Sequence, residues 1–600
     1  MGRPTTVQGF TFDFRGDPSA VWTAMADTAR SNSAIGLPRQ RIVEVPDGEG
    51  GQIFKANTKF GPFRLEWEDL PCNWVRGRWF EHRRRFIRGP LAAFDVRLDL
   101  TPAADGCRGD YRLSTTPNGL MGHIVLAAGF LRAGIRTMRG HAVQADRFAR
   151  GETQVPFQSR TAAVIGPQRV RLERLGAQLD QGPYGHGLGG RLVLEIAEAV
   201  DIDAERIRPL ALARRWAVPD RQVVEACLQA VRLGMLELRW DLLCPRCRGA
   251  KVNATSLDKL PTGAHCPTCN IDYDRDFSRN VELTFHAAQA IRPLEEGEFC
   301  LLGPMSTPHI WVHVTLEPGE RREIELELAA GPYRLRTLEA GPQVDIEHEG
   351  GRFPSVVVGA GEVTAGEPAP PGMIALRNDG PQRRTLVVED RRWAADALTA
   401  DRATTYQAFR DLCSAEVLRP GDEVSIGRVA LLFSDLKGST ALYEAVGDAA
   451  AYRLVRAHFA YLAAIVREHD GAVVKTIGDA VMAAFHDPVQ ALRAALAMQT
   501  RVREFNARNA TPVLLKLGLH EGPCIAVTLN DRLDYFGQTV NLAARLQGES
   551  RGGDIVLSLP LARQPGAAAV VQDQPRREEE AMLRGVAAPV RFLRLLPPSH

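Results

Sequence analysis

A short apolar run that ends in a carboxylate opens the last part of the chain. The segment RVALLFSDLKGST is read as a buried strand whose end presents Asp435, followed by a turn of small residues. Gly438, Ser439 and Thr440 then begin a helix that is expected to run to about residue 469. A glycine turn at a helix N-terminus directs free backbone N–H groups and the positive end of the helix dipole towards an anion. The segment therefore predicts a cradle for phosphates over residues 435–440.

A second carboxylate lies at the tip of an expected hairpin. GAVVKTIGDAVMAAF reads as two apolar strands joined at Ile477, Gly478 and Asp479, which lifts Asp479 onto the turn. Taken singly, Asp435 and Asp479 are ordinary turn residues. Two carboxylates that each lie at the end of a buried strand can, however, hold two metal ions about 3.5–4 Å apart, as two-metal phosphoryl-transfer sites do. The two residues are therefore the candidate ligands of two Mg²⁺ or Mn²⁺ ions.

A third set of polar residues lies on a short helix. The second half of DYFGQTVNLAARLQG reads as helical, so Asn541 and Arg545, four positions apart, share one face. An amide there can orient a ribose, and a guanidinium can meet negative charge that develops at phosphorus. Asp534 precedes Asn541 by seven residues. The three segments together predict a site that binds a nucleotide and acts on its phosphate.

The segments FSDLKGST, KTIGDAVMAAF and DYFGQTVNLAARL resemble the signature segments of the class III adenylate and guanylate cyclases, in the family's order. The resemblance covers residues 428–597, somewhat over a quarter of the chain. It implies a ferredoxin-like α/β catalytic domain in which Asp435 and Asp479 bind the two metal ions. Ser434 and Leu436 stand where Thr and Ile are usual in the family, and neither side chain is expected to bind a metal.

The same resemblance gives roles to the other polar residues. It implies that Lys475 and Asp534 read the base and that Asn541 and Arg545 stabilise the transition state. The segment MLRGVAAPVRFLRL resembles the closing strands of the family and places Arg584 near the triphosphate. Because members of the family form their site between two catalytic domains arranged head to tail, the resemblance also implies a homodimer with two equivalent sites.

Hydrogen bonding at the base favours ATP over GTP. Adenine offers a donor at its exocyclic amine and an acceptor at N1, which Asp534 and Lys475 respectively complement. Guanine presents the reverse pattern and would leave both side chains facing like partners, which costs several kcal/mol when buried. Arg is the usual cation of this chain and Lys is rare, which singles out Lys475. The sequence thus predicts an adenylate cyclase in which the ribose 3′-hydroxyl attacks the α-phosphate in line, giving 3′,5′-cyclic AMP and pyrophosphate.

Two pairs of cysteines in the middle of the chain have the spacing of a zinc ribbon. CPRC supplies Cys244 and Cys247, and CPTC supplies Cys266 and Cys269, with 18 residues between the pairs. Four thiolates spaced in this way can surround one Zn²⁺ tetrahedrally. All four positions are filled by Cys, so no position stays open for a catalytic water. The predicted zinc site is therefore structural.

The segments before the catalytic domain suggest several further domains, because 600 residues exceed what one hydrophobic core organises. A short strand and helix, a meander of alternating strands and one long helix over residues 119–149 resemble the START-like helix-grip fold, whose members often hold an apolar ligand. A packed domain without a ligand is the alternative. Residues 150–188 look like a connector, because they are rich in Gly, Gln and Arg. Three helices over residues 189–234 and a following strand suit a winged-helix module.

The whole chain is predicted to be a multidomain α+β protein. Alternating strands after residue 281 suggest a small β-sandwich, and a linker precedes the catalytic domain. The predicted parts are a START-like domain (1–150), a linker with winged-helix-like helices (151–240), a zinc ribbon (241–280), a β-sandwich-like domain (281–395), a linker (396–427) and the cyclase domain (428–600). The parts before the catalytic domain are expected to regulate it.

Composition limits the partners and the location. The formal net charge of +2 is close to neutral, which disfavours bulk attraction to nucleic acid or to a membrane surface. No run reaches the roughly 20 apolar residues of a membrane span. The ten Cys comprise two close pairs and six scattered singles, which indicates a reducing compartment. We therefore expect a cytoplasmic protein that binds ATP, a second copy of itself and, in the N-terminal domain, an apolar ligand.

Two other functions stay open from the sequence. The catalytic domain could bind a nucleotide and signal without turnover, although every catalytic position is filled. The winged-helix and zinc-ribbon segments could instead bind DNA, with the cyclase as a modulator. The near-neutral charge counts against DNA binding.

Overall fold

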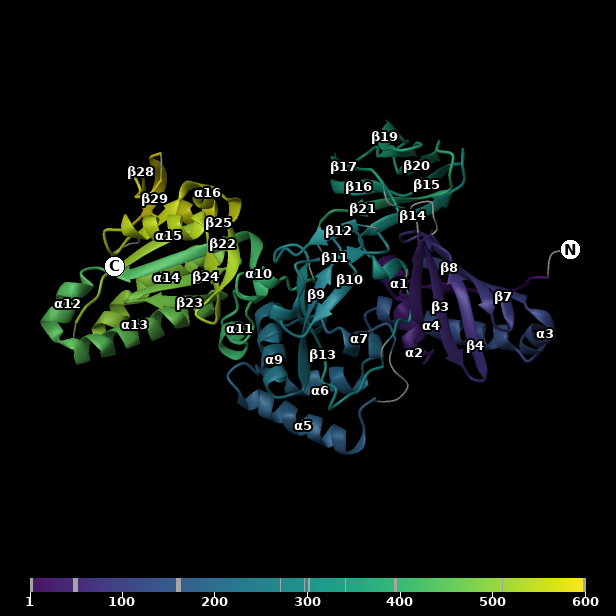
Figure 1. Ribbon diagram of the computed structural model, residues 1–600, viewed down its shortest axis with the longest axis horizontal. Coiled ribbons are helices and arrows are strands. Elements are labelled where there is room, and N and C mark those ends of the chain that lie inside the picture. The colour runs from purple at the N-terminus through teal and green to yellow at the C-terminus, as the bar shows by residue number, and fades with distance from the viewer. Residues whose placement is uncertain are drawn as a thin grey trace.

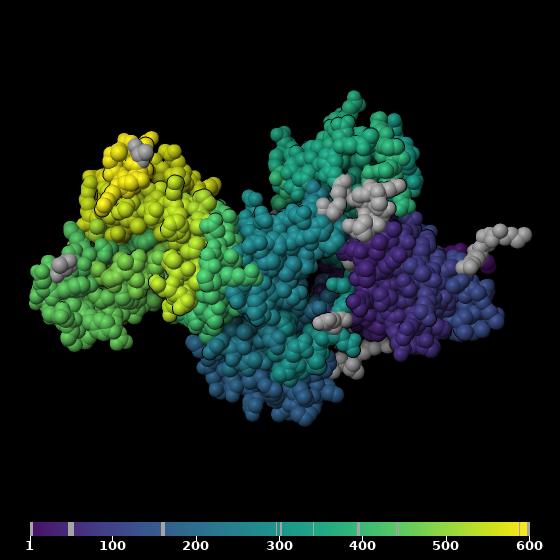
Figure 2. All heavy atoms as spheres, in the orientation of Figure 1, coloured from purple at the N-terminus to yellow at the C-terminus, as the bar shows by residue number. Residues whose placement is uncertain are grey.

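The computed structural model describes residues 4–46, 52–157, 163–269, 271–295, 297–300, 303–339, 341–392, 396–509, 511–586 and 588–596. Figure 1 shows the N-terminal part at one end of the longest axis and the C-terminal part at the other, with a central part between them. The space-filling view shows the C-terminal part in direct contact with the central part (Figure 2). No helix among the described residues is long and apolar enough to cross a membrane.

The N-terminal part is a curved antiparallel sheet with helices against it. The aromatic residues Trp22, Phe80 and Tyr111 lie in its core, and α4 packs against β1 and α1. A single helix was expected over residues 119–149; the structure has two, because Gly129 adopts φ 95° and ends the first. The elements are β1 (Thr6–Phe14), α1 (Pro18–Met25), α2 (Thr28–Ala34), β2 (Arg41–Pro46), β3 (Gln52–Phe60), β4 (Phe63–Asp69), β5 (Asn73–Val75), β6 (Trp79–Arg88), β7 (Leu91–Ala103), β8 (Gly106–Pro117), α3 (Gly119–Ala127) and α4 (Phe130–Ala149).

A group of strands over residues 310–390 continues this sheet. Val75 of β5 pairs with Val312 of β14, so the strand order is β1-β8-β7-β6-β5-β14-β21-β16-β17. A second sheet, in the order β15-β20-β18-β19, packs on this end with a shared apolar core. The elements are η2 (Pro304–Ser306), β14 (Ile310–Leu316), β15 (Arg321–Glu325), β16 (Gly331–Thr337), β17 (Gln343–His348), β18 (Pro354–Val358), β19 (Val363–Pro368), β20 (Met373–Asn378) and β21 (Arg384–Asp390).

The central part combines helices with a three-stranded sheet, β10-β9-β13. Two expectations are corrected here. The connector over residues 150–188 contains a helix, because Leu172, Leu175 and Leu179 recur at helical spacing and are buried. Residues 281–287 belong to this sheet and not to the β-sandwich, because β13 is buried along nearly its whole length and pairs with β9. The elements are α5 (Gly166–Gln181), α6 (Gly189–Glu198), α7 (Asp201–Glu205), α8 (Pro209–Trp216), α9 (Asp220–Arg232), β9 (Leu236–Leu243), β10 (Ala250–Ala254), η1 (Leu257–Lys259), β11 (Gly263–Cys266), β12 (Ile271–Asp274) and β13 (Val281–Ala287).

The segment expected as a linker over residues 396–427 is folded. It contains α10 (Ala400–Ala403) and α11 (Gln407–Leu412), and strand β22 (Glu423–Leu436) begins within it. Tyr406 and Phe409 are buried in one apolar cluster that also holds Trp240 of the central part and Tyr535 of the C-terminal part. This segment, which we call the wedge (residues 397–413), therefore joins the central part to the C-terminal sheet.

The C-terminal part is a mixed sheet in the order β23-β24-β22-β25-β27-β29-β28, with β26 paired to β25. Leu432 of β22 faces the helices α13 and α14, and its neighbours Leu431 and Phe433 face the cluster shared with the wedge. The helix expected to run to residue 469 is divided at Gly447, whose φ is 77°. The elements after β22 are α12 (Ser439–Val446), α13 (Asp448–Glu468), β23 (Gly471–Ile477), β24 (Ala480–Phe485), α14 (Pro488–Ala507), β25 (Leu515–Leu529), β26 (Arg532–Phe536), α15 (Gln538–Gly548), β27 (Ile555–Ser558), α16 (Leu559–Ala562), α17 (Pro565–Gln572), β28 (Arg576–Ala581) and β29 (Val590–Leu595).

Candidate active site and metal centre

Asp435 and Asp479 lie side by side at one end of the C-terminal sheet. Asp435 is the penultimate residue of β22, and Asp479 occupies the two-residue turn between β23 and β24. β24 pairs with β22 as far as Ser434, which lies opposite Val481. This pairing brings the turn next to the end of β22. Burial and the neighbouring Asp479 carboxylate raise the pKa of Asp435 above its ordinary value. Burial and the mutual repulsion of the two half-buried carboxylates outweigh the charge of the neighbouring Lys516, which acts in the opposite direction.

The pair fits divalent metal ions. Oδ2 of Asp479 is buried and has no hydrogen-bond partner among the described residues, although buried carboxylate oxygens are normally paired. Carboxylate oxygens are the ligands that Mg²⁺ and Mn²⁺ prefer. A cation between Asp435 and Asp479 would satisfy the unpaired oxygen and remove the repulsion that raises the pKa of Asp435.

The turn after β22 has the form of an anion cradle. Gly438 adopts φ 72°, which a residue with a side chain rarely adopts, and it caps α12. A Cβ built at Gly438 would meet nothing within 4 Å, so the space above the turn is open. Ser439 begins the helix, which leaves its first N–H groups unpaired within α12. The side chain of Thr440 lies outside the described residues.

Lys475 on β23 and Asp534 on β26 form an ion pair. Lys475 Nζ donates to Asp534 Oδ2 at 2.6 Å, and Asp534 is only 6% exposed. The backbone N–H of Tyr535 donates to the other carboxylate oxygen at 2.8 Å. Residues 59 positions apart in the sequence thus meet, because β23 and β26 lie in the same sheet.

Asn541 and Arg545 lie on α15 with exposed side chains. Arg584 is exposed in the turn between β28 and β29. Among the described residues, no side-chain hydrogen bond or ion pair links any of these three to Asp435 or Asp479. Within one chain the structure therefore brings the candidate residues together only as two separate pairs, the carboxylates and the Lys475–Asp534 ion pair.

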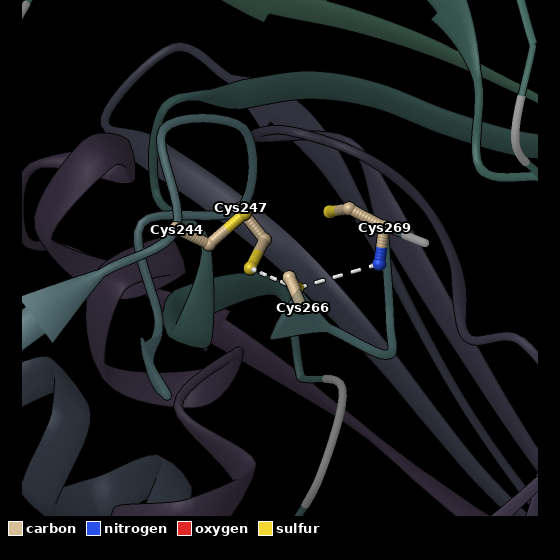
Figure 3. Close-up of side chains that lie close together, drawn as sticks. All are labelled: Cys244, Cys247, Cys266 and Cys269. Atoms are coloured by element: carbon tan, nitrogen blue, oxygen red, sulfur yellow. Dashed lines mark hydrogen bonds between the residues drawn. The ribbon is translucent and has the colours of Figure 1, made fainter. Parts of the chain in front are cut away.

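The four cysteines meet in a buried cluster (Figure 3). All four side chains are buried, and the four sulfur atoms lie within 4.8 Å of one another. Cys247 Sγ and Cys266 Sγ are 3.8 Å apart, which equals the sulfur–sulfur edge of about 3.8 Å that a tetrahedron with Zn–S bonds of 2.3 Å requires. Hydrogen bonds from the neighbouring thiols, that of Cys244 first, lower the pKa of Cys247. The cluster fits a zinc ion.

The cluster joins the central part to the large sheet. The backbone oxygen of Arg246, between the first two cysteines, accepts a hydrogen bond from His309 Nε2 at 2.8 Å. Arg248 donates to the backbone oxygen of Asp390 at 2.8 Å. Behind these contacts, the buried Arg336 donates twice to Glu389, at 2.8 and 3.0 Å. Sequence reasoning missed this role, because no motif marks the partners on β16 and β21.

Sequence reasoning also missed the wedge residues that touch the two strands of the Lys475–Asp534 pair. Gln407 Oε1 accepts from the backbone N–H of Val473, two residues before Lys475, at 2.8 Å. Arg410 Nη1 donates to the backbone oxygen of Leu533, directly before Asp534, at 3.0 Å. The helical signal in TYQAFRDL was the only trace of this contact in the sequence.

Comparison with known proteins bears on two segments. Residues 422–564 match the family described as the adenylate and guanylate cyclase catalytic domain. Residues 190–300 match a family of unknown function (DUF5939).

Several catalogued relatives are cyclases. An adenylate cyclase of Lachancea kluyveri is 34% identical over 162 residues, which are 24% of this chain and 9% of that protein. An adenylate cyclase of Anabaena cylindrica is 30% identical over 23% of this chain and 31% of that protein. Retinal guanylyl cyclase 1 of Homo sapiens is 32% identical over 22% of this chain and 14% of that protein. The chain thus matches less than a third of the length of each of these relatives.

Solved cyclase structures align with part of the chain. The adenylyl cyclase CyaB of P. aeruginosa aligns with 30% of this chain and 98% of that chain, at 23% identity and a TM-score of 0.27. The guanylate cyclase domain of RhGC from Catenaria anguillulae, solved with GTP, aligns with 29% of this chain at 20% identity and a TM-score of 0.26. On the family match, residues 422–564 form the catalytic domain of a class III nucleotidyl cyclase.

Proposed function

We propose that the chain is an adenylate cyclase that converts ATP to 3′,5′-cyclic AMP and pyrophosphate. The relatives include both adenylate and guanylate cyclases, so the choice of base depends on the residues themselves. The observation that carries the proposal is the Lys475–Asp534 ion pair. An ammonium is a pure donor and a carboxylate a pure acceptor, which complements N1 and the exocyclic amine of adenine. Guanine would face two like groups, at a cost of several kcal/mol.

The remaining residues suit the chemistry of cyclisation. Asp435 and Asp479 would hold two Mg²⁺ or Mn²⁺ ions, which supply Lewis-acid activation and charge neutralisation when bound. The turn at Gly438 and Ser439, with Thr440, is suited to receive the triphosphate. Asn541 orients the ribose so that its 3′-oxygen faces the α-phosphorus. Arg545 stabilises the negative charge that develops at that phosphorus, and Arg584 contacts the triphosphate.

The catalytic site is shared between two copies of the chain. Cyclase domains commonly dimerise. In a single chain, no described contact joins the Asp435–Asp479 pair to Asn541 or Arg545. Ile477, next to the carboxylate turn, is 52% exposed, and Phe536, next to Asp534, is 61% exposed. A second copy arranged head to tail would cover such apolar residues and bring the two half-sites together.

The parts before the catalytic domain act as regulatory modules in this proposal. The sheet and α4 of residues 1–150 suit a START-like helix-grip domain, and the helices and β9–β10 of the central part suit a winged-helix module. The four cysteines are proposed to hold one structural Zn²⁺. The strands over residues 310–390 suit a β-sandwich, which shares its first sheet with the N-terminal part.

Product analysis tests the proposal. Purified full-length chain is incubated separately with ATP, GTP, CTP and UTP, with Mg²⁺ or Mn²⁺, and the products are identified by mass. We expect cyclic AMP from ATP and at most traces from the other three. Cyclic GMP from GTP as the main product would overturn the assignment of the base, and no cyclic product from any nucleotide would overturn the activity.

A further inference from the structure

Two adjacent cavities lie between the sheet and the helices of the N-terminal part. The first has a volume of about 290 Å³ and is lined by α1, α2, α4 and the strands β6 to β8. The second has a volume of about 220 Å³ and is lined by β3, β4, β6 and β7 with the start of α4. Leu37, Arg84, Phe94 and Phe130 line both cavities. Together they approach the size of sites that hold small organic ligands, about 300–1,000 Å³.

The first cavity carries a cluster of polar groups on its sheet wall. Arg84 Nε donates to Asp69 Oδ1 at 3.1 Å, and His82 Nε2 lies 3.1 Å from the same oxygen. Burial by itself would raise the pKa of Asp69, but the interactions with Arg84 and His82 outweigh burial and hold this pKa well below its usual range. Asp69 therefore stays ionised. Neither Nη group of Arg84 donates a hydrogen bond to a described residue. The guanidinium of Arg84 thus keeps both Nη groups for a further acceptor.

Tyr111 adds a further donor to the same wall. It is 5% exposed, and its hydroxyl makes no hydrogen bond with a described residue. Burial raises the pKa of Tyr111 and outweighs the nearby charge of Arg84, which would lower it. The hydroxyl therefore keeps its proton. The Tyr111 hydroxyl and the Nη groups of Arg84 have no acceptor among the described residues, so an occupant of the cavity that these residues line can accept from them.

The second cavity is almost wholly apolar. The aromatic rings of Phe63, Phe86, Phe94 and Trp67 line it, together with Leu65 and Leu91. Apolar side chains are also exposed at its rim, where Phe60 and Phe130 are 46% and 38% exposed. On α3, whose Val125 lines the cavity, Leu120, Met121 and Ile124 are 79%, 51% and 51% exposed. An exposed apolar rim of this kind suits the passage of an apolar molecule.

We propose that the two cavities form one binding site for an amphipathic carboxylic acid, with its carboxylate on Arg84 and Tyr111 and its apolar body in the second cavity. Asp69 holds the guanidinium by its Nε edge and leaves the Nη edge for the ligand, a bidentate geometry that suits a carboxylate. The aromatic walls bury the hydrocarbon body. This ligand differs from the nucleotide substrate, and its site lies outside the catalytic domain.

The wall of this site is joined to the central part. On α2, Thr28, Ser31 and Asn32 line the first cavity. Asn32 Nδ2 donates to the backbone oxygen of Phe299 at 2.9 Å, and Arg30 forms an ion pair with Asp203 of α7. An occupant of the cavity therefore touches the helix that holds the N-terminal part against the central part.

The test is titration calorimetry of the full-length chain with decanoate and with decan-1-ol, at equal concentrations. We expect decanoate to bind once per chain and at least about tenfold more tightly than the alcohol, because only the acid forms charge-assisted hydrogen bonds with Arg84. Arg84→Gln should weaken decanoate binding by at least about tenfold and bring it close to that of the alcohol. Arg85→Gln is the matched control, because Arg85 is the next residue on β6 and pairs with Asp95 instead.

A second variant keeps the test independent of folding at Arg84. Thr137→Phe fills the first cavity from α4 and leaves the Arg84–Asp69 pair in place. It should abolish binding of decanoate while the melting profile is retained. Absence of saturable decanoate binding to the wild-type chain, equal affinities for acid and alcohol, or unchanged binding in Thr137→Phe would each overturn the proposal.

Discussion

Asp435 and Asp479 are two carboxylates that the fold holds together without a described cation between them. Burial and their repulsion raise the pKa of Asp435, and one oxygen of Asp479 is buried without a partner among the described residues. A carboxyl whose pKa is raised in the folded state stabilises the protein below its ordinary pKa and loses that contribution as the pH rises through the folded pKa. Around neutral pH the metal-free pair therefore destabilises the fold, and a bound divalent cation should reverse this.

Asp435→Asn removes one of the two charges. We expect turnover to fall at least about 100-fold, because charge stabilisation at the phosphates is lost. In EDTA the variant should melt at a higher temperature than the wild type at pH 7, and this difference should shrink as the pH is lowered towards 4. Added Mn²⁺ should raise the melting temperature of the wild type only. Asp573→Asn is the control, because Asp573 is an exposed carboxylate at the end of α17. If added Mn²⁺ still raised the melting temperature of Asp435→Asn, the assignment of Asp435 as a metal ligand would be contradicted.

Asp534 is the acceptor proposed for the amine of adenine. Asp534→Asn keeps the shape of the side chain but weakens the ion pair with Lys475 and turns part of the acceptor into a donor. We expect kcat/KM for ATP to fall about 10- to 100-fold, and the preference for ATP over GTP to fall with it. Steady-state rates with both nucleotides measure this. Asp531→Asn, three residues earlier and exposed, should leave the preference unchanged.

The candidate residues differ in how far the sequence alone could locate them. Asp435 and Asp479 each follow from a local pattern, an apolar strand that ends in a turn. The contact between Lys475 and Asp534 spans 59 positions and depends on the order of strands in the sheet, which periodicity does not encode. That pairing came from the resemblance to a family. The contacts of Gln407 and Arg410 carry no motif, so only the folded chain reveals them.

At the scale of elements, the wedge is the contact through which the central part reaches the strands that carry Lys475 and Asp534. Gln407 and Arg410 bond the backbones of β23 and β26 next to Lys475 and Asp534. Tyr535, between these contacts, bonds Thr404 of the wedge through its hydroxyl at 3.1 Å. A shift of the wedge would therefore move the two base-reading side chains relative to one another.

Arg410→Gln tests this role of the wedge. Loss of the bond to Leu533 and of the cation–π contact with Tyr535 should raise KM for ATP about fivefold, as expected for one hydrogen bond, with a smaller change in kcat. Steady-state kinetics separates the two constants. The Mn²⁺ response of the melting temperature should persist, because no described hydrogen bond or ion pair joins the wedge to the carboxylate pair. Arg493→Gln is the control, because Arg493 is an exposed residue on α14. If both variants raised KM for ATP equally, Arg410 would have no specific role in the wedge.

The cysteine cluster is the second element with a measurable function. Cys266→Ser removes one of four thiolates and should reduce bound zinc from one per chain to below half, measured by elemental mass spectrometry after dialysis. Because the loop that carries Cys244 and Cys247 holds the large sheet through Arg246 and Arg248, the variant should also be cleaved faster by protease between the central part and this sheet. Cys413→Ser, a buried cysteine outside the cluster, should keep its zinc. Zinc retained in Cys266→Ser would contradict the site.

The sequence predicts many elements and misses others for identifiable reasons. The alternating runs do form strands, and in strands such as β8 buried and more exposed residues alternate. Helix ends at Gly129 and Gly447 were missed, because a single glycine inside an apolar helical pattern does not by itself signal a break. The helix α5 was not predicted, because the segment that contains its three buried leucines is rich in Gly, Gln and Arg. Strand β13 was placed in the wrong sheet, because a pairing partner cannot be read from a strand's own residues.

At the scale of the molecule, the chain is a series of contacts that leads from the N-terminal cavity to the base-reading residues. Arg30 and Arg39 of the N-terminal part form ion pairs with Asp203 and Glu205 of α7. The central part and the C-terminal sheet then share one apolar cluster through the wedge. Each junction is built from described side chains, so a ligand in the cavity has a continuous packed route to the catalytic domain.

Complementation between inactive chains tests whether the catalytic site needs two copies. Asp435→Ala damages the metal half-site and Asn541→Ala the ribose half-site, so each variant alone should be inactive. If a site takes one half from each chain, random mixing makes half of the dimers mixed, and each mixed dimer holds one intact site. We therefore expect about a quarter of the wild-type activity after mixing and exchange of subunits. Asp435→Ala mixed with Asp479→Ala is the control, because both changes damage the same half-site. No activity in the first mixture would mean that each chain forms its catalytic site alone, and restored activity in the control would contradict the assignment of both carboxylates to one half-site.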